Sequence, residues 1–181
     1  MLETKRLLLR QWKYSDAKDL YEYAKDPLVG LSAGWEPHKS VEYSRKLIKS
    51  AEFETETYAV VLKESKKIIG SVGMVLGKAS NLGLLDNEGE VGCWVGVPFW
   101  GMGIMPEAVN ELIRHGFEDL GLSKIWCAYF DGNEKSKRVQ DKCGFVYHHT
   151  NENVECFLLK KRITEHVACL GKETWLSNLK H

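Results

Sequence analysis

Residues 90 to 108 read EVGCWVGVPFWGMGIMPEA, which predicts a strand, a glycine-containing turn and the start of a helix, in that order. Glycines let the backbone turn so that successive N–H groups point into one concavity. The free N–H groups and the positive dipole end of the following helix add attraction for an anion such as a pyrophosphate. The stretch therefore indicates an anion-binding turn, although a GxG spacing taken alone more often marks a plain tight turn.

Two familiar phosphate-binding motifs do not match this stretch. Pro106 stands where the motif GxGxxG has its third glycine, and the predicted helix does not lead into a βαβ unit. The chain also has no Gly-Lys-Ser or Gly-Lys-Thr sequence. The residues therefore support neither a dinucleotide-binding fold nor a P-loop.

Composition narrows the class of protein. A chain of 181 residues corresponds to one domain, spanning residues 1–181. Its 25 Lys and Arg residues balance 25 Asp and Glu residues, so it lacks the positive excess that binding to nucleic acid requires. The longest uncharged stretch, Val91 to Pro106, is short for a membrane span and rich in glycine, and the N-terminus MLETKRLLLRQW does not resemble a signal peptide. We expect a cytoplasmic protein that binds neither nucleic acid nor membrane.

Cysteine and histidine spacing predicts no metal site. The five cysteines are widely separated and form no CxxC pair, so we interpret them as reduced core residues. The histidines show no HxxxH or HExxH spacing. Adjacent residues of a strand point to opposite faces of the sheet, so we expect that His148 and His149 cannot act as one site.

Hydrophobic periodicity predicts an α+β fold with one largely antiparallel sheet. Pro27 and Gly30 are expected to end a first helix, and Leu47, Ile48 and Ala51 to form the buried stripe of a second. Expected strands cover 6–12, 58–62, 67–76, 88–97, 124–129, 145–147 and 155–161, and expected helices cover 15–24, 40–51, 106–120 and 133–143, with one more around Trp175.

Three segments resemble one family. FWGMGIMPEA, residues 99–108, resembles the acyl-coenzyme A loop of the GNAT superfamily of N-acetyltransferases, specifically its RimJ/RimL-like branch. Residues 133–145 reproduce that branch's pattern N-x-x-S-x-R-V-x-x-K-x-G-F, and the opening ETKRLLLRQWKYSDA is similar to its first strand and helix. The resemblance implies a central sheet of about seven strands flanked by about four helices, with a splayed strand pair that holds acyl-coenzyme A.

The resemblance also implies a cofactor site for acetyl-coenzyme A without metal. Backbone N–H groups of Gly101, Met102, Gly103, Ile104 and Met105 would hold the pyrophosphate, and Trp100 would belong to the same site. Backbone groups of Trp94 and Val95 would contact the pantetheine arm. Asn133 would be the N-cap of its short helix, would contact the same arm through its side chain, or would do both. Met102 replaces a frequent Lys or Arg and Met105 a small residue, so these two positions could weaken the phosphate contact or crowd the helix start.

Two residues are expected to take part in catalysis. An amine must be neutral to attack an acyl group, and Glu90 matches the position where relatives often carry a glutamate as base; otherwise it is an exposed acid at the end of its strand. Ser136 matches the hydroxyl that donates a hydrogen bond to the departing thiolate; otherwise it is an ordinary serine of a first helical turn.

The segment GWxPH, with Trp35 and His38, is typical of the wall of the acceptor pocket in RimJ/RimL-like proteins. Trp35 is expected to contact the substrate, and His38 either does so or fixes its loop by a hydrogen bond. The resemblance implies transfer of an acetyl group from acetyl-coenzyme A to a primary amine, on a protein N-terminus or a small molecule, by direct attack in a ternary complex. The alternative is a non-catalytic module of the same fold that binds or senses acyl-coenzyme A. A homodimer is compatible with both.

Overall fold

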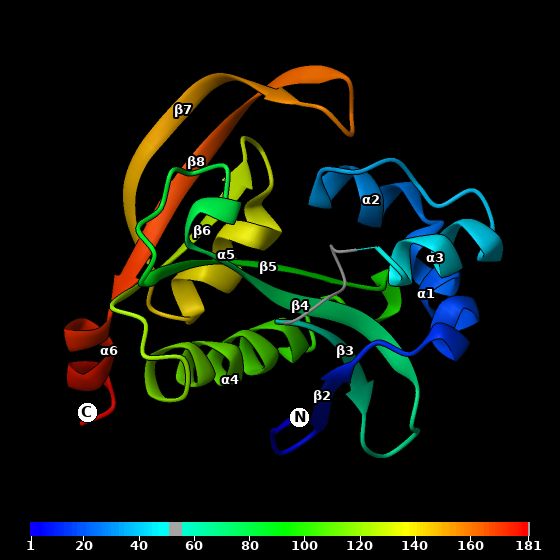
Figure 1. Ribbon diagram of the computed structural model, residues 1–181, viewed down its shortest axis with the longest axis horizontal. Coiled ribbons are helices and arrows are strands. Elements are labelled where there is room, and N and C mark those ends of the chain that lie inside the picture. Colours follow the sequence, from blue (N-terminus) through cyan, green and yellow to red (C-terminus); the bar gives the residue numbers. More distant parts are fainter. Residues whose placement is uncertain (51–55, 181) are drawn as a thin grey trace.

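The computed structural model describes residues 1–50 and 56–180 (Figure 1), so Ala51, expected on the second helix, lies outside the described residues. Within those ranges the chain forms one mixed sheet of eight strands and six α-helices. The fold class is confirmed as α+β, while the expected numbers of about seven strands and about four helices were too low. The missed elements are a helix at 27–33, a short strand at the N-terminus and most of the last strand, at 161–171.

The elements follow one another in the order β1 (Leu2–Glu3), β2 (Leu7–Gln11), α1 (Ala17–Ala24), α2 (Pro27–Ala33), α3 (Val41–Ile48), β3 (Thr57–Leu62), β4 (Ile68–Leu76), β5 (Glu88–Val95), α4 (Ile104–Glu118), β6 (Lys124–Phe130), α5 (Glu134–Lys142), β7 (Val146–Cys156), β8 (Lys161–Gly171) and α6 (Lys172–Asn178). The order of strands in the sheet is β1-β2-β3-β4-β5-β6-β8-β7. Every neighbouring pair is antiparallel except β5 and β6.

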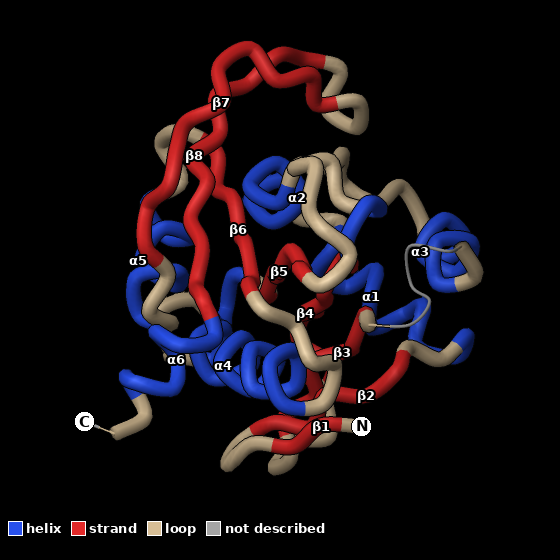
Figure 2. Tube along the Cα trace, turned by 60° about the vertical axis from the view of Figure 1, so that its left-hand side comes forward, coloured by secondary structure: helices blue, strands red, loops and turns tan. Residues whose placement is uncertain are grey.

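The sheet has an apolar core on each face. On one face Val91 and Val95 of β5 pack in a large cluster with the buried side of α4, which includes Leu112 and Phe117. On the other face a smaller cluster joins α1 to β3 and β4, and Trp94 packs against it. Figure 2 shows the sheet running between α4 and the group formed by α1 and α3. Successive residues of β5 therefore serve opposite sides of the sheet, as its period of two requires.

The parallel pair β5 and β6 separates partway along its length. Three residue pairs join the two strands, the last of them Glu90 with Trp126. Beyond that point β5 continues to Val95 beside β4, while β6 continues to Phe130 beside β8. The splayed strand pair implied by the family resemblance is therefore present, and it opens directly after Glu90.

The structure corrects two expectations about element boundaries. Pro27 begins α2 instead of ending the preceding helix, because Asp26 accepts a hydrogen bond from the Leu28 N–H and proline is compatible with a first helical position. The segment 155–161, expected to be one strand, contains the end of β7, a turn at 157–160 and the start of β8, which together form the tip of a long hairpin. In Figures 1 and 2 this hairpin extends past the rest of the sheet and bends toward α2.

The expectation that His148 and His149 face apart was wrong. The register of β7 against β8 shifts between Tyr147 and His149, which marks a β-bulge. The Nδ1 atoms of the two imidazoles lie 2.8 Å apart, and the ring of His148 contacts that of Trp126. Strict alternation of side chains fails here because the bulge inserts an unpaired residue into β7.

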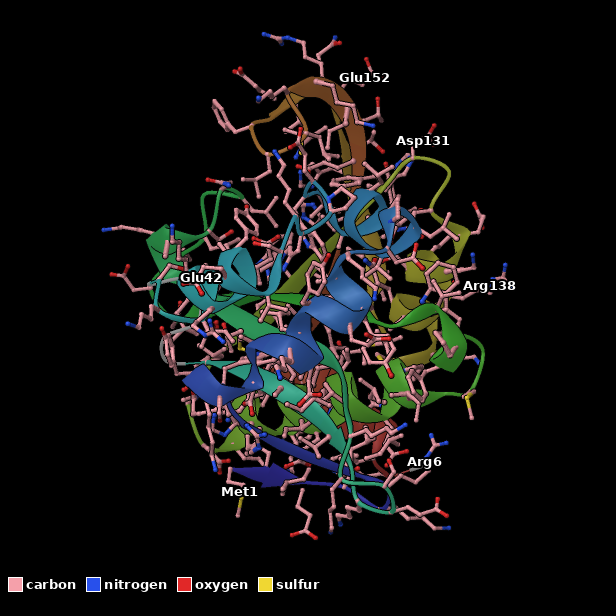
Figure 3. All side chains as sticks on the ribbon, turned by 90° about the vertical axis from the view of Figure 1, so that its right-hand side faces the viewer. Met1, Arg6, Glu42, Asp131, Arg138 and Glu152 are labelled. Atoms are coloured by element: carbon pink, nitrogen blue, oxygen red, sulfur yellow. The ribbon has the colours of Figure 1, made fainter. Side chains whose placement is uncertain are left out.

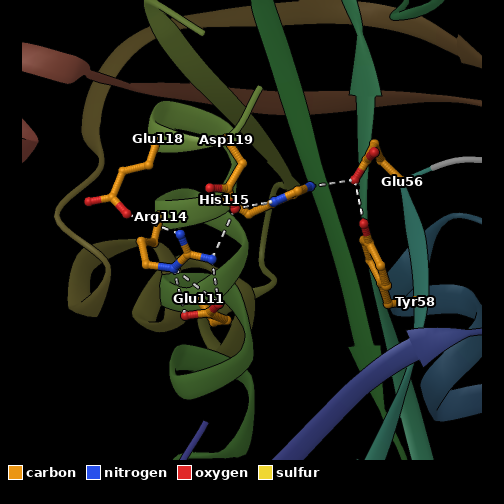
Figure 4. A network of polar contacts seen from close by, with 7 residues as sticks. All are labelled: Glu56, Tyr58, Glu111, Arg114, His115, Glu118 and Asp119. Carbon is orange, nitrogen blue, oxygen red and sulfur yellow. Dashed lines mark hydrogen bonds and ion pairs between the residues drawn. The ribbon is translucent and has the colours of Figure 1, made fainter. Parts of the chain in front are cut away.

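A polar network ties the C-terminal half of α4 to the sheet (Figure 4). The Nε2 atom of His115 lies 2.9 Å from Oε2 of Glu56, and its Nδ1 atom lies 2.8 Å from Oδ2 of Asp119. Tyr58 donates to the same Glu56 oxygen, and burial together with this bond raises the pKa of Tyr58. On the outer side Arg114 binds three carboxylates, those of Glu111, Glu118 and Asp119. These contacts thus fix the C-terminal end of α4, the helix that follows the glycine turn.

Gly70 of β4 provides a test of how tightly β4 and β5 approach each other. A Cβ atom at this position would lie 2.3 Å from the carbonyl oxygen of Trp94, closer than the two can approach. We expect Gly70→Ala to lower the free energy of unfolding by about 1–3 kcal/mol, because backbone must move to relieve the overlap. Gly92→Ala on β5 is the control, since nothing lies within 4 Å of its Cβ position. Equal denaturation midpoints for the two variants would contradict the packing.

Candidate active site

A cleft of about 1090 Å³ occupies the gap that opens between β5 and β6. Ligand pockets usually measure about 300–1,000 Å³, so this cleft suits a large ligand. Its walls are α2, the end of β5, the turn before α4, the end of β6 and the first turns of α5. Nine of the residues expected to bind the cofactor line it: Trp94, Val95, Trp100, Gly101, Gly103, Ile104, Met105, Asn133 and Ser136.

The turn at residues 101–105 borders this cleft, and Gly101, Gly103, Ile104 and Met105 line it. Gly101 and Gly103 have φ angles of +76° and +72°, a conformation that glycine adopts without steric cost. None of the five N–H groups donates to an acceptor within the described part of the chain. The N–H groups of Ile104 and Met105 belong to the first turn of α4, where a helix leaves its donors free. The turn therefore has the geometry of an anion cradle.

Met102 and Met105 differ in their relation to the cleft. The side chain of Met105 packs in the core beneath α4. Met102 does not contribute to the cleft wall: its side chain is exposed and its carbonyl oxygen accepts a hydrogen bond from Nη1 of Arg6 at 3.0 Å. Neither thioether therefore blocks the N–H groups of the turn.

The edge of β5 offers backbone groups toward the cleft, which Cys93 and Val95 both line. The N–H of Gly96 bonds to Ile69 on β4, and backbone groups alternate along a strand, so those of Val95 point away from β4 and into the gap. The Val95 carbonyl accepts from Nε1 of Trp100 at 2.9 Å. The carbonyl of Trp94 instead lies against Gly70 of β4. The Val95 N–H is thus among the groups of this edge that a ligand could reach.

Helix α5 brings Asn133 and Ser136 to the opposite wall. The Oδ1 atom of Asn133 caps the helix by accepting from the Ser136 N–H at 3.2 Å, and its Nδ2 atom donates to the Ser32 carbonyl of α2 at 3.1 Å. The hydroxyl of Ser136 faces the cleft and has no hydrogen-bond partner among the residues described. It remains available as a donor.

Basic side chains surround the outer part of the cleft. Lys135, Arg138 and Lys142 all contribute to its lining. The Lys135 ammonium lies 4.0 Å from the centre of the Trp100 ring, which is favourable for a cation–π contact. Arg138 projects outward from α5 in Figure 3. This distribution places positive charge beside the glycine turn.

Glu90 lies at the vertex of the gap, on the face of β5 that also carries Trp94. It does not line the large cleft. Its Oε2 atom accepts from the Ser80 hydroxyl at 2.6 Å. Burial raises the pKa of Glu90, the hydrogen bond from Ser80 partly opposes this, and the nearby charge of Glu165 adds to the increase. Glu90 is thus a largely buried carboxyl, not the exposed acid of the alternative interpretation.

A second cavity of about 320 Å³ lies on the Glu90 face of the sheet. Trp35 and His38 line it, as do Leu20 of α1 and Phe157 and Leu158 at the tip of the β7–β8 hairpin. Trp94 belongs to both cavities and separates them. The expected acceptor residues are therefore brought together, around one wall shared with the cleft.

His38 both lines this cavity and fixes its loop. Its Nδ1 atom lies 2.8 Å from the buried Ser44 hydroxyl. The backbone N–H of His38 donates a hydrogen bond to the Ala24 carbonyl. Burial lowers the pKa of His38 to about 4, so the imidazole is neutral near pH 7.

Two groups of lining residues were not expected from the sequence. Leu28, Leu31 and Ser32 of α2 cover the large cleft, and Phe157 and Leu158 cover the smaller cavity. The pair Asp26 and Pro27 is a helix-start signal that could have indicated α2. Nothing local in residues 157–158 predicts their position, because the long hairpin carries them there.

No group of three or more His, Cys, Asp or Glu side chains in the described part of the chain is arranged to hold a metal ion. No helix within those residues is both long enough and apolar enough to cross a membrane.

Comparisons with known proteins identify similarity to one family of acetyltransferases. Residues 6–146 match the family model described as an acetyltransferase (GNAT) domain. An uncharacterised N-acetyltransferase of Bacillus licheniformis is 30% identical over 152 residues, which cover 80% of this chain and 81% of that protein.

Solved structures agree with this match. A GNAT-family acetyltransferase from Bacillus anthracis superimposes with a TM-score of 0.81 at 19% identity, covering 95% of this chain and 98% of that one. A ribosomal-protein alanine acetyltransferase from Vibrio fischeri superimposes with a TM-score of 0.72 at 26% identity, covering 96% and 97%.

Burial of Glu90 has a consequence for stability that pH can test. Because its pKa is raised above 4.5 in the folded state, the folded chain binds more protons than the unfolded chain just above that pH, and the free energy of unfolding falls as pH rises through this window. Glutamine cannot ionise, so Glu90→Gln should melt at a higher temperature than the wild type at pH 7. The difference should disappear near pH 4, which serves as the internal control. A variant less stable than the wild type at pH 7 would contradict the assignment.

Proposed function

Because the chain belongs to the GNAT acetyltransferase family, we propose that it transfers an acetyl group from acetyl-coenzyme A to a primary amine by direct attack in a ternary complex. The observation that carries the proposal is the set of free N–H groups at residues 101–105, in a turn that borders a large cleft where two strands separate. A pyrophosphate is the ligand that such a turn at a helix N-terminus suits best.

Acetyl-coenzyme A would lie along the length of the cleft. The pyrophosphate would bind at residues 101–105, and the distal phosphates would meet Lys135, Arg138 and Lys142. The pantetheine arm would follow the free edge of β5, where the Val95 N–H points into the gap, with Asn133 on the facing wall. This direction leads the thioester toward the vertex of the gap and toward Glu90.

Glu90 would accept the proton that the amine must lose, directly or through water. An α-amine with a pKa of about 7.7–8.0 is roughly one-tenth neutral at pH 7, so a base increases the reactive fraction. Burial moves the pKa of Glu90 upward, toward the range in which a general base is effective. The amine nitrogen forms a bond to the acetyl carbon, the carbon–sulfur bond breaks, and the free Ser136 hydroxyl donates a hydrogen bond to the departing thiolate.

The acceptor would enter from the opposite face of the sheet, through the cavity around Trp35. This cavity has a volume of about 320 Å³ and is covered by residues of the β7–β8 hairpin, so it suits a small molecule or a single terminal residue of a peptide. The Vibrio fischeri relative is named for an alanine of a ribosomal protein, which belongs to the second class. A cytoplasmic location would give access to both classes.

Release of the coenzyme A thiol tests the proposal. The protein is mixed with acetyl-coenzyme A and, separately, with short peptides, polyamines and aminoglycosides, and each peptide is matched by its N-acetylated form. We expect thiol release with at least one free amine and none with its blocked form. Glu90→Gln should lower the rate about a hundredfold near pH 7, and the loss should shrink above pH 8, where the amine needs no base.

Two results would contradict the proposal. Coenzyme A binding without amine-dependent thiol release would favour the non-catalytic module. An unchanged pH profile in Glu90→Gln would remove Glu90 from the reaction.

The glycine turn can be tested separately from catalysis. Gly103→Val should raise the dissociation constant of coenzyme A at least tenfold in calorimetry, because a branched side chain at a φ of +72° displaces the backbone donors. Gly121→Val is the matched control: it has a φ of +71°, follows the other end of α4, and has nothing within 4 Å of its Cβ position. Both variants should lose about 1–2 kcal/mol of stability, but the control should keep its affinity. Equal affinities would contradict the turn as the phosphate site.

A further inference from the structure

Arg6, near the start of β2, is bound to the glycine turn almost a hundred residues later in the chain. Its Nη1 atom donates to the Met102 carbonyl at 3.0 Å, and its Nη2 atom lies 3.6 Å from the position of a Cβ on Gly103. Its Nε atom donates to Oε2 of Glu107 at 2.6 Å, and its backbone N–H donates to Oε1 of the same carboxylate at 2.8 Å. The turn and the first part of α4 are therefore held together by one side chain.

The contact with Met102 constrains the direction of the next N–H group. In a trans peptide the C=O of one residue and the N–H of the following residue point in opposite directions. Arg6 and Met102 do not line the cleft, whereas Gly101 and Gly103 do. Holding the Met102 carbonyl on the outer side therefore directs the Gly103 N–H to the inner side, toward the cleft.

Arg6 is itself held in place by a second set of contacts. The Thr4 hydroxyl donates to Oε1 of Glu107, so that carboxylate receives bonds from both Thr4 and Arg6. These bonds lower the pKa of Glu107, although burial alone would raise it. A planar guanidinium can bind the carbonyl and the carboxylate at once in a fixed geometry, which a lysine ammonium cannot do.

The contacts of Arg6 contribute little to the free energy of unfolding. The Arg6 side chain is 43% exposed, and an ion pair in such a position usually contributes little to folding. In Figure 3 Arg6 lies well away from Arg138, which projects from the cleft wall on α5. The two arginines therefore differ in role: Arg138 can reach the ligand, while Arg6 reaches the outer side of the turn.

We propose that Arg6 is a positioning residue for the cofactor, which orients the Gly103 N–H toward the pyrophosphate by fixing the Met102 carbonyl. The inference rests on the proposed function, since it requires coenzyme A to bind at this turn. It assigns to the first strand of the chain a part in cofactor binding that does not involve contact with the ligand.

The test compares Arg6→Ala and Arg6→Lys with Arg10→Ala. Arg10 lies on the same strand and makes a comparable ion pair, with Asp16, at a distance from the turn, so it controls for lost stability. Coenzyme A affinity is measured by calorimetry, and the amide proton of Gly103 is followed by NMR at saturating coenzyme A. In the wild type this proton should shift downfield as it bonds to phosphate.

We expect Arg6→Ala to weaken coenzyme A binding about tenfold and to reduce the Gly103 shift, while signals of the Val95 region still respond. Arg6→Lys should be intermediate in both measurements, and it decides the question if Arg6→Ala does not fold. Arg10→Ala should keep the affinity and the shift of the wild type. This pattern would not arise from a general loss of stability.

Three results would overturn the inference. Wild-type affinity and shift in both Arg6 variants would show that the turn does not depend on Arg6. Weaker binding with an undiminished Gly103 shift would mean that Arg6 contacts the phosphate itself. Equal losses in Arg10→Ala would indicate a structural effect only. In contrast, a wild-type protein that does not bind coenzyme A at all would overturn the proposed function as well.

Discussion

The separation of β5 from β6 after Glu90 is the constraint on which the rest of this structure depends. Inside a sheet, backbone donors and acceptors satisfy one another, so a strand that leaves its neighbour must find other partners for them. The Val95 carbonyl finds the Trp100 indole, and the Val95 N–H remains directed into the gap. The same separation creates the large cleft. The glycine turn that follows β5 borders this cleft and adds further unbonded N–H groups.

Because side chains alternate along β5, neighbouring residues of this strand lie on opposite faces of the sheet and have different surroundings. Val91 and Val95 pack beneath α4 and stabilise the helix that begins at the glycine turn. Glu90 and Trp94 lie on the other face, where Trp94 lines the smaller cavity. The proposed base is thereby placed outside the lining of the large cleft, and Trp94 forms a wall common to both cavities. The environment that raises the pKa of Glu90 is a direct result of this position, because burial at the vertex removes water from the carboxylate.

Contacts between segments that are distant in sequence complete both cavities. Asn133 of α5 bonds to Ser32 of α2 across the cleft, and the thiol of Cys156 at the hairpin tip lies against the carbonyl of Gly34. Arg6 joins the first long strand to the glycine turn. Each of these contacts is individually modest in energy, but together they fix elements whose own sequences contain no information about one another. The cavities are therefore products of topology more than of any single motif.

The sequence by itself determined the features that depend on neighbouring residues: the glycine turn, the helix that starts near Pro106, the cap at Asn133 and most of the central strands. Those features follow from backbone conformations that glycine and proline favour and from local periodicity. Only the tertiary structure decided that Glu90 is buried, that His148 and His149 meet at a bulge, that α2 covers the cleft and that Arg6 reaches Met102. The physical reason is that burial, strand register and long-range hydrogen bonds are set by which segments pack together, and the chemistry of one segment does not specify its partner.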